Sequence, residues 1–166
     1  MKRIWQTAMS LITVALLVTG CQPDAFKDAG APRDVKSSII GTWKLTKATQ
    51  VDEESARKGF PYRELDITTI YPYTDFVLKL DAGEPGNFTT TPGASPRIIR
   101  FATGTWTLND PEFPSALLLK NGTTTDTATL GGYPVGAATT LKIKLRKKEA
   151  ATGKLLISYT YEFAKQ

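Results

Sequence analysis

Apolar and polar residues alternate with a period of two along most of the chain after residue 38. The clearest run is residues 140–146, TLKIKLR, in which apolar and basic residues alternate without a break. A second run near the C-terminus has its apolar side chains on one face: Ile157, Tyr159, Tyr161 and Phe163. This pattern is typical of a strand with one face on a core and the other in water.

Turn residues such as Asn121-Gly122 and Gly131-Gly132 separate eight runs of this kind. The predicted strands lie near residues 39–48, 74–81, 86–91, 97–108, 115–120, 126–131, 139–148 and 155–164. Residues 52–58 predict a short helix or turn, and residues 66–69 are a candidate start of another. We therefore predict an all-β, eight-stranded antiparallel up-and-down barrel, because closure of the sheet removes its exposed edges.

The N-terminus has the three-part layout of an export signal. Lys2 and Arg3 precede an apolar run at residues 8–18, and small residues lead to Cys21. The apolar run is shorter than the ~20 residues that a spanning helix needs. Val18-Thr19-Gly20-Cys21 resembles the bacterial lipobox, which implies cleavage before Cys21 and its attachment to the membrane by lipid. The alternative is an ordinary secretory signal that ends at a chance cysteine.

Composition divides the chain into three predicted parts. Residues 1–20 are the cleaved signal peptide, residues 21–37 are polar and predict a lipidated flexible tether, and residues 38–166 form the barrel domain. The formal net charge of the chain is +5, and residues 1–20 contribute two of its basic residues. The remaining net charge of +3 on residues 21–166 gives no indication of a nucleic-acid partner. We expect the protein to be a monomer in the cell envelope.

Few residues are suited to catalysis. The chain has no histidine, and Cys21, its single cysteine, is assigned to lipid; this excludes histidine-based acid–base and nucleophilic mechanisms. The local acidic pairs, Glu53-Glu54 and Asp110 with Glu112, lie in predicted connections and suggest solvated turn residues. We predict a protein that is not an enzyme and that has no cofactor and no metal site.

A basic stripe follows the strand predicted at residues 139–148. Its members are Lys142, Lys144, Arg146, Lys147 and Lys148. The stripe indicates either a solvated strand face that discourages edge pairing or a surface that contacts anionic lipid headgroups.

One short motif links the chain to a known group. Gly41-Thr42-Trp43, on the first predicted strand, resembles the Gly-x-Trp motif that opens lipocalins. The whole domain is similar to lipocalin-like lipoproteins of unknown function from Bacteroidetes, through residues 40–45, 50–53, 104–106 and 158–163. The resemblance implies a barrel fold and an envelope setting such as a glycan-uptake system. The outer-membrane location is expected from Gln22, which directly follows Cys21, and from the thin acidic tether with Asp24 and Asp28.

The resemblance also raises two local expectations. Lipocalins commonly place a basic residue from late in the barrel over the motif tryptophan, and the last predicted strand, residues 155–164, has none. Arg146 on the preceding strand is then the nearest candidate. A second Gly-Thr-Trp, with Gly104 and Trp106, indicates the same local need as Gly41 and Trp43: a glycine for close approach and a tryptophan that fills the interior.

A possible modification site lies at Asp126-Thr127-Ala128. This sequence resembles the Asp-Thr-aliphatic sequon that Bacteroidetes use for O-glycosylation of exported proteins. The alternative is that Thr127 is an ordinary strand residue, favoured there by its branched side chain.

Alternation places seven rings inside the barrel: Trp43, Phe76, Phe88, Trp106, Tyr159, Tyr161 and Phe163. They suffice to fill a small barrel, so a packed core is expected. Because buried hydroxyls need partners, we also expect a shallow site for a small apolar or sugar-like molecule, lined by Phe76, Trp106, Tyr159 and Tyr161.

Two functions remain open at this point, with a loop-presenting inhibitor as a weaker third. The first is a membrane-anchored binding module for such a small molecule, and the second is an accessory lipoprotein that docks on an envelope complex through its outer surface. An open, aromatic-lined cavity favours the first. A filled barrel with an apolar outer patch favours the second.

Overall fold

The computed structural model describes residues 34–132 and 139–166. The strands are β1 (Gly41–Asp52), β2 (Glu64–Asp66), β3 (Val77–Gly83), β4 (Gly86–Thr91), β5 (Thr103–Leu108), β6 (Ala116–Asn121), β7 (Thr124–Leu130), β8 (Thr140–Lys148) and β9 (Leu155–Lys165). The helices are α2 (Val35–Ile39), α3 (Glu53–Arg57) and the 3-10 turn η1 (Tyr73–Asp75).

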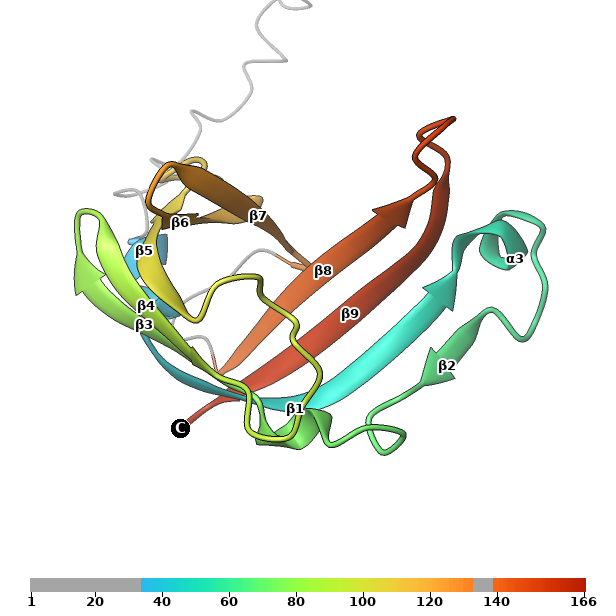
Figure 1. The fold of residues 1–166 in the computed structure, drawn as a ribbon, viewed down its shortest axis with the longest axis horizontal. Helices are drawn as coiled ribbons and strands as arrows, with labels where there is room; N and C mark the ends of the chain where they lie inside the picture. The colour runs from blue at the N-terminus through green and yellow to red at the C-terminus, as the bar shows by residue number, and fades with distance from the viewer. Residues whose placement is uncertain (1–33, 133–138) are drawn as a thin grey trace, which may run out of the picture. The chain divides into compact units, whose positions relative to one another are not determined.

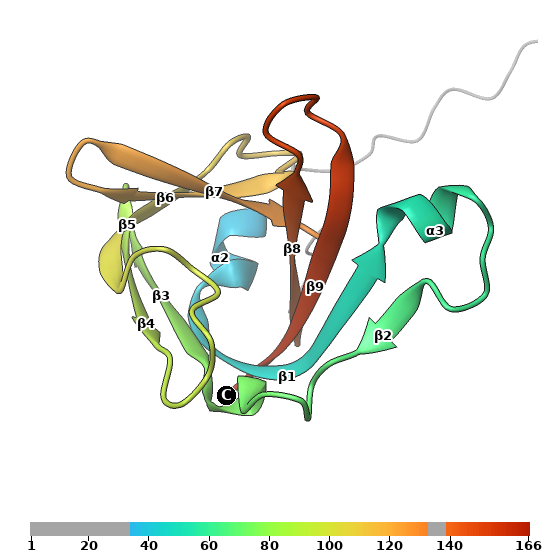
Figure 2. The same ribbon diagram turned by 45° about the vertical axis from the view of Figure 1, so that its right-hand side comes forward.

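Eight of the strands form a closed antiparallel up-and-down barrel, as predicted. Neighbours pair in the order β1, β3, β4, β5, β6, β7, β8, β9, and β9 pairs back to β1 (Figure 1). The remaining strand, β2, lies outside the ring. It pairs with residues 49–51 of β1, whereas residues 41–44 of β1 pair with β3. Figure 2 shows β2 and α3 projecting as a flap beside the barrel.

One predicted strand differs from the structure. The strand predicted at residues 97–108 begins only at Thr103; Ile98 and Ile99 instead lie in a loop and are buried in the core. The short helix or turn expected to start at residues 66–69 is a turn. The Asp66 carboxylate accepts hydrogen bonds from the Thr68 backbone N–H at 2.9 Å and from its hydroxyl at 2.6 Å, which makes a local turn. The short helix predicted over residues 52–58 is confirmed as α3.

The folded domain begins earlier than its predicted boundary at residue 38. Helix α2 starts at Val35, where Asp34 caps it by accepting a hydrogen bond from the Ser37 backbone N–H at 3.0 Å. Val35 and Ile39, one helical turn apart, are both buried in the core. The last residues of the predicted tether therefore belong to the domain, while residues 1–33 lie outside the described residues.

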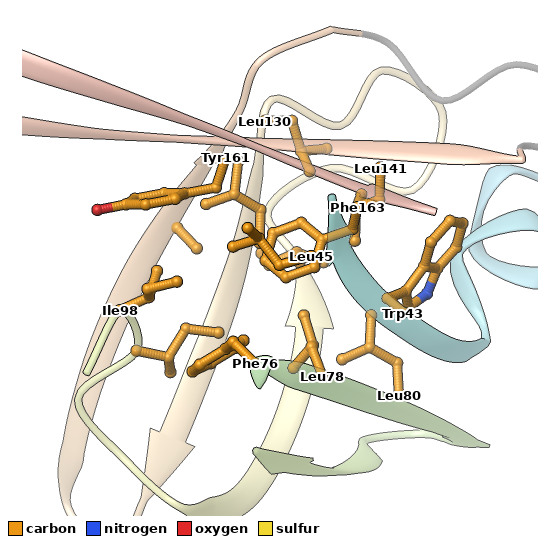
Figure 3. Packing of buried hydrophobic residues seen from close by; sticks show 14 of the residues in the cluster. Trp43, Leu45, Phe76, Leu78, Leu80, Ile98, Leu130, Leu141, Tyr161 and Phe163 are labelled. Carbon is orange, nitrogen blue, oxygen red and sulfur yellow. The ribbon is translucent and has the colours of Figure 1, made fainter. Parts of the chain in front are cut away.

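The barrel interior is filled by side chains, as the packed-core prediction required. Six of the seven predicted inward rings are buried: Trp43, Phe76, Phe88, Trp106, Tyr161 and Phe163. The seventh, Tyr159, is half-buried and packs against the same cluster. Figure 3 shows the cluster running from Trp43, beside α2, through Leu45 and Phe163 to Tyr161 and Ile98.

The strand registers define two ends of the barrel. One end, which we call the closed end, carries α2, the start of β1 and the end of β9, where Gly41 pairs with Leu80 and Trp43 with Lys165. The opposite end, the open end, carries α3, the β8–β9 turn and the loop of residues 92–102. Both ends of the folded domain, Asp34 and Gln166, therefore lie at the closed end.

Candidate functional site

The closed end is built around the two Gly-Thr-Trp motifs. The indole N–H of Trp43 donates to the Ile39 carbonyl at 2.7 Å, and that of Trp106 donates to the Asp81 carbonyl at 2.9 Å. A lysine also lies over each ring, with Lys165 Nζ 5.4 Å from the centre of Trp43 and Lys36 Nζ 5.6 Å from the centre of Trp106. Each tryptophan thus has a backbone acceptor for its indole N–H and a lysine ammonium over its ring.

The expectation that Arg146 would cover Trp43 is wrong, because Lys165 does so. Strand β9 continues one residue past its predicted end, and that residue is Lys165. Gly41 leaves it room, since a Cβ there would lie 2.7 Å from Lys165 Cε. Gly104 has a corresponding role, because a Cβ there would lie 2.2 Å from the Lys120 carbonyl oxygen. The shared structural need predicted for the two motifs is confirmed.

The open end contains a cleft, because β7 and β8 separate there. In the described part of the chain these strands pair only at Thr129 with Lys144 and at Leu130 with Ile143. Figure 1 shows the β6–β7 hairpin and the β8–β9 hairpin diverging beyond this point. The resulting cleft has a volume of about 720 Å³. Its lining includes residues 96–98 and Arg100 of the loop, Asp126, Thr127 and Thr129 of β7, residues 144–147 of β8, and the rings of Tyr73, Tyr159 and Tyr161.

A row of tyrosine rings forms the aromatic part of the cleft. Tyr159 and Tyr161 stack with ring centres 6.2 Å apart and an interplanar angle of 11°. Tyr73 lies 5.9 Å from Tyr161, and Tyr71 meets Tyr73 edge-on at 5.9 Å. At the other end of the row, Lys147 Nζ lies 5.8 Å from the centre of the Tyr159 ring. Flat rings of this kind can pack against an apolar or sugar ring of a ligand.

Two tyrosines of the row, Tyr73 and Tyr161, have raised pKa values. Burial, followed by the proximity of Tyr73 and Tyr159, raises the pKa of Tyr161 above its ordinary value. Burial likewise raises the pKa of Tyr73. The rings of Tyr73 and Tyr161 lie side by side, with centres 5.9 Å apart. Tyr73 lies in a connection without periodicity, so the alternation pattern did not identify it.

Cations surround the tyrosine row. Five basic residues line the cleft, together with one carboxylate, Asp126: Arg97, Arg100, Lys144, Arg146 and Lys147. Lys144 Nζ lies 3.9 Å from the Glu53 carboxylate, and the Arg100 guanidinium lies 5.6 Å from the Phe101 ring centre. Part of the predicted basic stripe therefore faces a cleft and is not only a solvated strand face.

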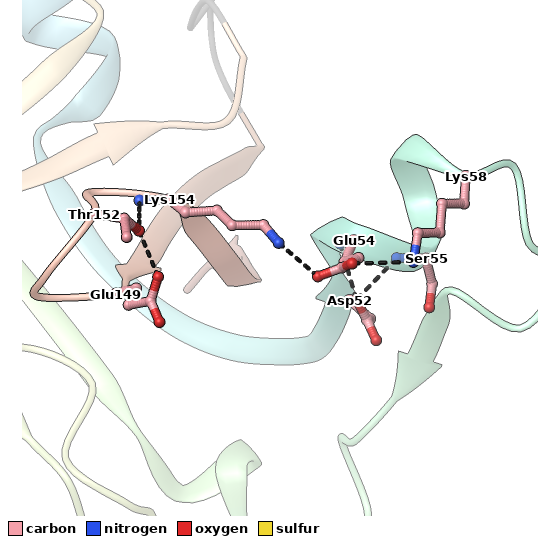
Figure 4. Close-up of polar contacts among 7 residues, drawn as sticks. All are labelled: Asp52, Glu54, Ser55, Lys58, Glu149, Thr152 and Lys154. Atoms are coloured by element: carbon pink, nitrogen blue, oxygen red, sulfur yellow. Dashed lines mark hydrogen bonds and ion pairs between the residues drawn. The ribbon is translucent and has the colours of Figure 1, made fainter.

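Helix α3 braces the strands that carry the cleft. Asp52 caps the helix by accepting backbone hydrogen bonds from Glu54 at 2.9 Å and Ser55 at 3.0 Å. Glu54 bridges Lys58 at 3.0 Å and Lys154, in the β8–β9 turn, at 2.8 Å (Figure 4). The hydrogen bonds from Lys154 and then from Lys58 lower the pKa of Glu54 to about 2.

The neighbouring carboxylate, Glu53, reaches the barrel directly. It accepts a hydrogen bond from the hydroxyl of Ser158, which is fully buried on β9. Glu53 and Glu54 are therefore tied to β8, β9 and their turn, and the prediction that they are only solvated turn residues is wrong. Asp110 does fit that prediction, since it accepts the backbone N–H groups of Glu112 and Phe113 at 2.8 Å.

The structure does not bring the four predicted ligand-binding residues together. Tyr159 and Tyr161 line the cleft, but Phe76 is buried in the core beside Phe163, with ring centres 6.1 Å apart. Trp106 lies at the closed end, under Lys36. Alternation identified the inward face correctly but gave no position along the barrel axis. Cys21 lies outside the described residues, and Thr127 is exposed on β7 at the cleft.

The comparisons with known proteins identify a family without an assigned role. Residues 20–164 match a family described as a domain of unknown function, DUF5004. This chain belongs to the DUF5004 family. No curated protein matches the chain. Membership in the DUF5004 family agrees with the expected resemblance to proteins of unknown function, while the Bacteroidetes and lipoprotein parts of that resemblance stay predictions.

Two further features of this DUF5004 domain lie outside the open-end cleft. Among residues 34–132 and 139–166, no helix is long and apolar enough to cross a membrane. A second hollow, of about 660 Å³, lies along β5 and β6 and is lined largely by threonines, Leu118, Lys120 and Asn121. Trp106 also borders it but is fully buried, and the lining has no row of tyrosine rings like that of the open end.

Proposed function

We propose that this DUF5004 protein is a non-catalytic binding module whose open-end cleft takes up a small molecule with an apolar or sugar-like ring. The observation that carries the proposal is the row of Tyr73, Tyr161 and Tyr159 along a cleft of about 720 Å³. That volume lies within the range of about 300–1,000 Å³ for small-molecule sites. The filled core restricts the ligand to the cleft at the barrel end.

The proposal includes a location. The signal sequence and Cys21 support a lipoprotein anchored in the outer membrane of the cell envelope, which we propose to be a monomer. Cys21→Ser should abolish incorporation of labelled fatty acid. Continued labelling of the variant would refute the anchor, and protection of the domain from protease added to intact cells would assign it to the periplasmic face.

Ligand uptake is tested by titrating the protein with lipids and oligosaccharides while tyrosine and tryptophan fluorescence and thermal stability are followed. A ligand at 100 times its dissociation constant adds about 2.7 kcal/mol to the free energy of unfolding. Tyr159→Ala should remove most of that gain. Tyr62→Ala is the matched control, because Tyr62 is 95% exposed and lies outside the cleft. Absence of any response across broad panels would refute the proposal.

A second candidate function, docking on an envelope protein complex, is favoured by the flap beside β1. Five large apolar or aromatic side chains are exposed within residues 60–71: Phe60, Tyr62, Leu65, Ile70 and Tyr71. Contiguous exposed apolar side chains commonly mark protein contacts. Phe60→Ser with Tyr62→Ser should release the protein from such a complex on native gels of solubilised membranes. Unchanged migration of a complex that contains the protein would refute this role.

A further inference from the structure

We infer that the ligand of the open-end cleft is an anion: a ring-bearing acid whose ring packs on the tyrosine row and whose charged group binds the surrounding arginines and lysines. The inference rests on the proposed function and specifies the chemical class of ligand for the same site. Its basis is the imbalance of charge in the lining, where five basic residues accompany the single carboxylate of Asp126.

The cations reach the cleft from two separate elements. Arg97 and Arg100 come from the loop of residues 92–102, and Lys144, Arg146 and Lys147 come from β8. A solvated strand face would account for alternate residues of β8 alone. It would not account for arginines contributed by a loop that follows β4 in sequence.

Internal carboxylates satisfy little of this charge. Lys144 lies 3.9 Å from Glu53, at the outer limit of an ion pair. Lys147 and Arg100 lie over the rings of Tyr159 and Phe101, and no ion pair of Arg97 or Arg146 is found among residues 34–132 and 139–166. The Asp126 carboxylate accepts a hydrogen bond from the adjacent Thr127 backbone N–H at 3.0 Å. The guanidinium groups are therefore available for bidentate binding of a ligand's carboxylate.

Selectivity also follows from the arrangement of rings and cations. A neutral ring ligand would contact the tyrosines but leave the cations to water, whereas an acid of similar shape would add charge-assisted hydrogen bonds next to a partly dehydrated surface. Arginine stacks on rings and grips planar acids, so the same side chains can contact both parts of the ligand. A sugar acid and an aromatic acid share this chemistry.

The test uses two matched pairs of probes in titration calorimetry with the full domain. Trigalacturonate is compared with its methyl ester, and indole-3-acetate with indole-3-acetamide. We expect the acid of at least one pair to bind about tenfold more tightly than its neutral partner. That advantage should shrink strongly in about 1 M salt, where the screening length falls to about 3 Å. The pair that responds distinguishes a sugar acid from an aromatic acid.

Arg97→Gln combined with Arg146→Gln should reduce the affinity for the acid about tenfold and leave the neutral probe unchanged. The control is Lys142→Gln, on the same strand, because Lys142 pairs with Glu162 at 3.3 Å and does not line the cleft. Thermal melting of both variants without ligand verifies that they fold.

Three outcomes would overturn the inference. Equal affinity for acid and neutral probes, or an equal loss of affinity in the Lys142→Gln control, would refute the preference for an anion. The proposed binding function would not be affected by either result. Failure of every probe in these pairs, with arginine-dependent binding to phosphatidylglycerol vesicles instead, would assign the cations to a membrane surface. Absence of binding by any probe, together with flat responses in the broader panels, would refute the proposed function as well.

Discussion

The closed and open ends of the barrel use the same side-chain chemistry for different purposes. At the closed end, lysines lie over tryptophans and every indole N–H meets a backbone carbonyl. At the open end, Lys147 lies over Tyr159, but the rings and cations border a hollow of about 720 Å³. Where other protein atoms cover an aromatic ring and its cation, as at the closed end, the pair stabilises the fold. Where the pair borders a hollow, as at the open end, the ring and the cation can contact a ligand.

The backbone makes the difference between the two ends. Near the closed end, β8 continues its ladder across both neighbours, with Ile143 paired to Leu130 of β7 and Tyr161 of β9. Towards the open end the ladder with β7 stops at Lys144, while the ladder with β9 continues through Lys147. One side of β8 is thereby left to line the cleft.

The largest expected contrast in stability is between Trp43→Ala and Tyr159→Ala. Trp43 is fully buried at the closed end, so its removal leaves a cavity and should lower the free energy of unfolding by about 3–5 kcal/mol. Tyr159 is half-buried and borders the cleft, so Tyr159→Ala should cost clearly less. Urea unfolding of both variants measures the contrast. Similar losses of stability in the two variants would contradict the difference between the closed end and the open end.

A smaller effect is expected at alkaline pH, and only from the open end. Burial raises the pKa of Tyr161 above that of an unfolded tyrosine, about 10. Its contribution to stability is therefore complete below pH ~10 and is lost as the pH rises towards the higher folded value. Tyr161→Phe should flatten that decline, because phenylalanine has no hydroxyl that can ionise.

The alkaline prediction is measured by urea unfolding at several pH values from neutral to strongly alkaline. Tyr62→Phe serves as the control, because the Tyr62 side chain is 95% exposed. An unchanged alkaline decline in Tyr161→Phe would show that the buried hydroxyl is not its source.

Substitution of the lysines that lie over aromatic rings should have different effects at the two ends of the barrel. Lys165→Met removes the cation over the buried Trp43 and should lower stability by about 0.5–1 kcal/mol. Lys147→Met at the cleft should change stability less but weaken ligand binding more. Chemical unfolding and calorimetry with the same two variants test the pair, and a reversal of the two effects would contradict the comparison.

The smallest effect is expected from the α3 contacts in acid. The pKa of Glu54 is lowered to about 2, so its contribution is present above the unfolded value of about 4.3 and is lost as the pH falls towards 2. Glu54 is partly exposed, and the change should be confined to α3 and the β8–β9 turn. Amide exchange in residues 53–58, compared between the native protein and Glu54→Gln as the pH is lowered, measures this loss. Equal acid sensitivity in the two proteins would show that Glu54 is not its source.

Local alternation was sufficient to predict the barrel but not its open end. The strands were predictable because each presents one apolar face, as in residues 140–146. Helix α2 was missed because its surroundings are polar, although the spacing of Val35 and Ile39 was a usable signal. The cleft depends on where the β7–β8 ladder stops and on Tyr73 in a connection, and neither follows from a local pattern.

The position of α2 determines at which end of the barrel the upstream chain joins the folded domain. Because the folded chain starts at the closed end, any upstream attachment pulls on that end and leaves the cleft on the far side of the barrel. Between Cys21 and Asp34, an extended chain spans at most about 45 Å. If Cys21 is lipidated as proposed, the point of attachment and the cleft are at opposite ends of the folded barrel, and the cleft is not the part of the domain to which the tether is joined.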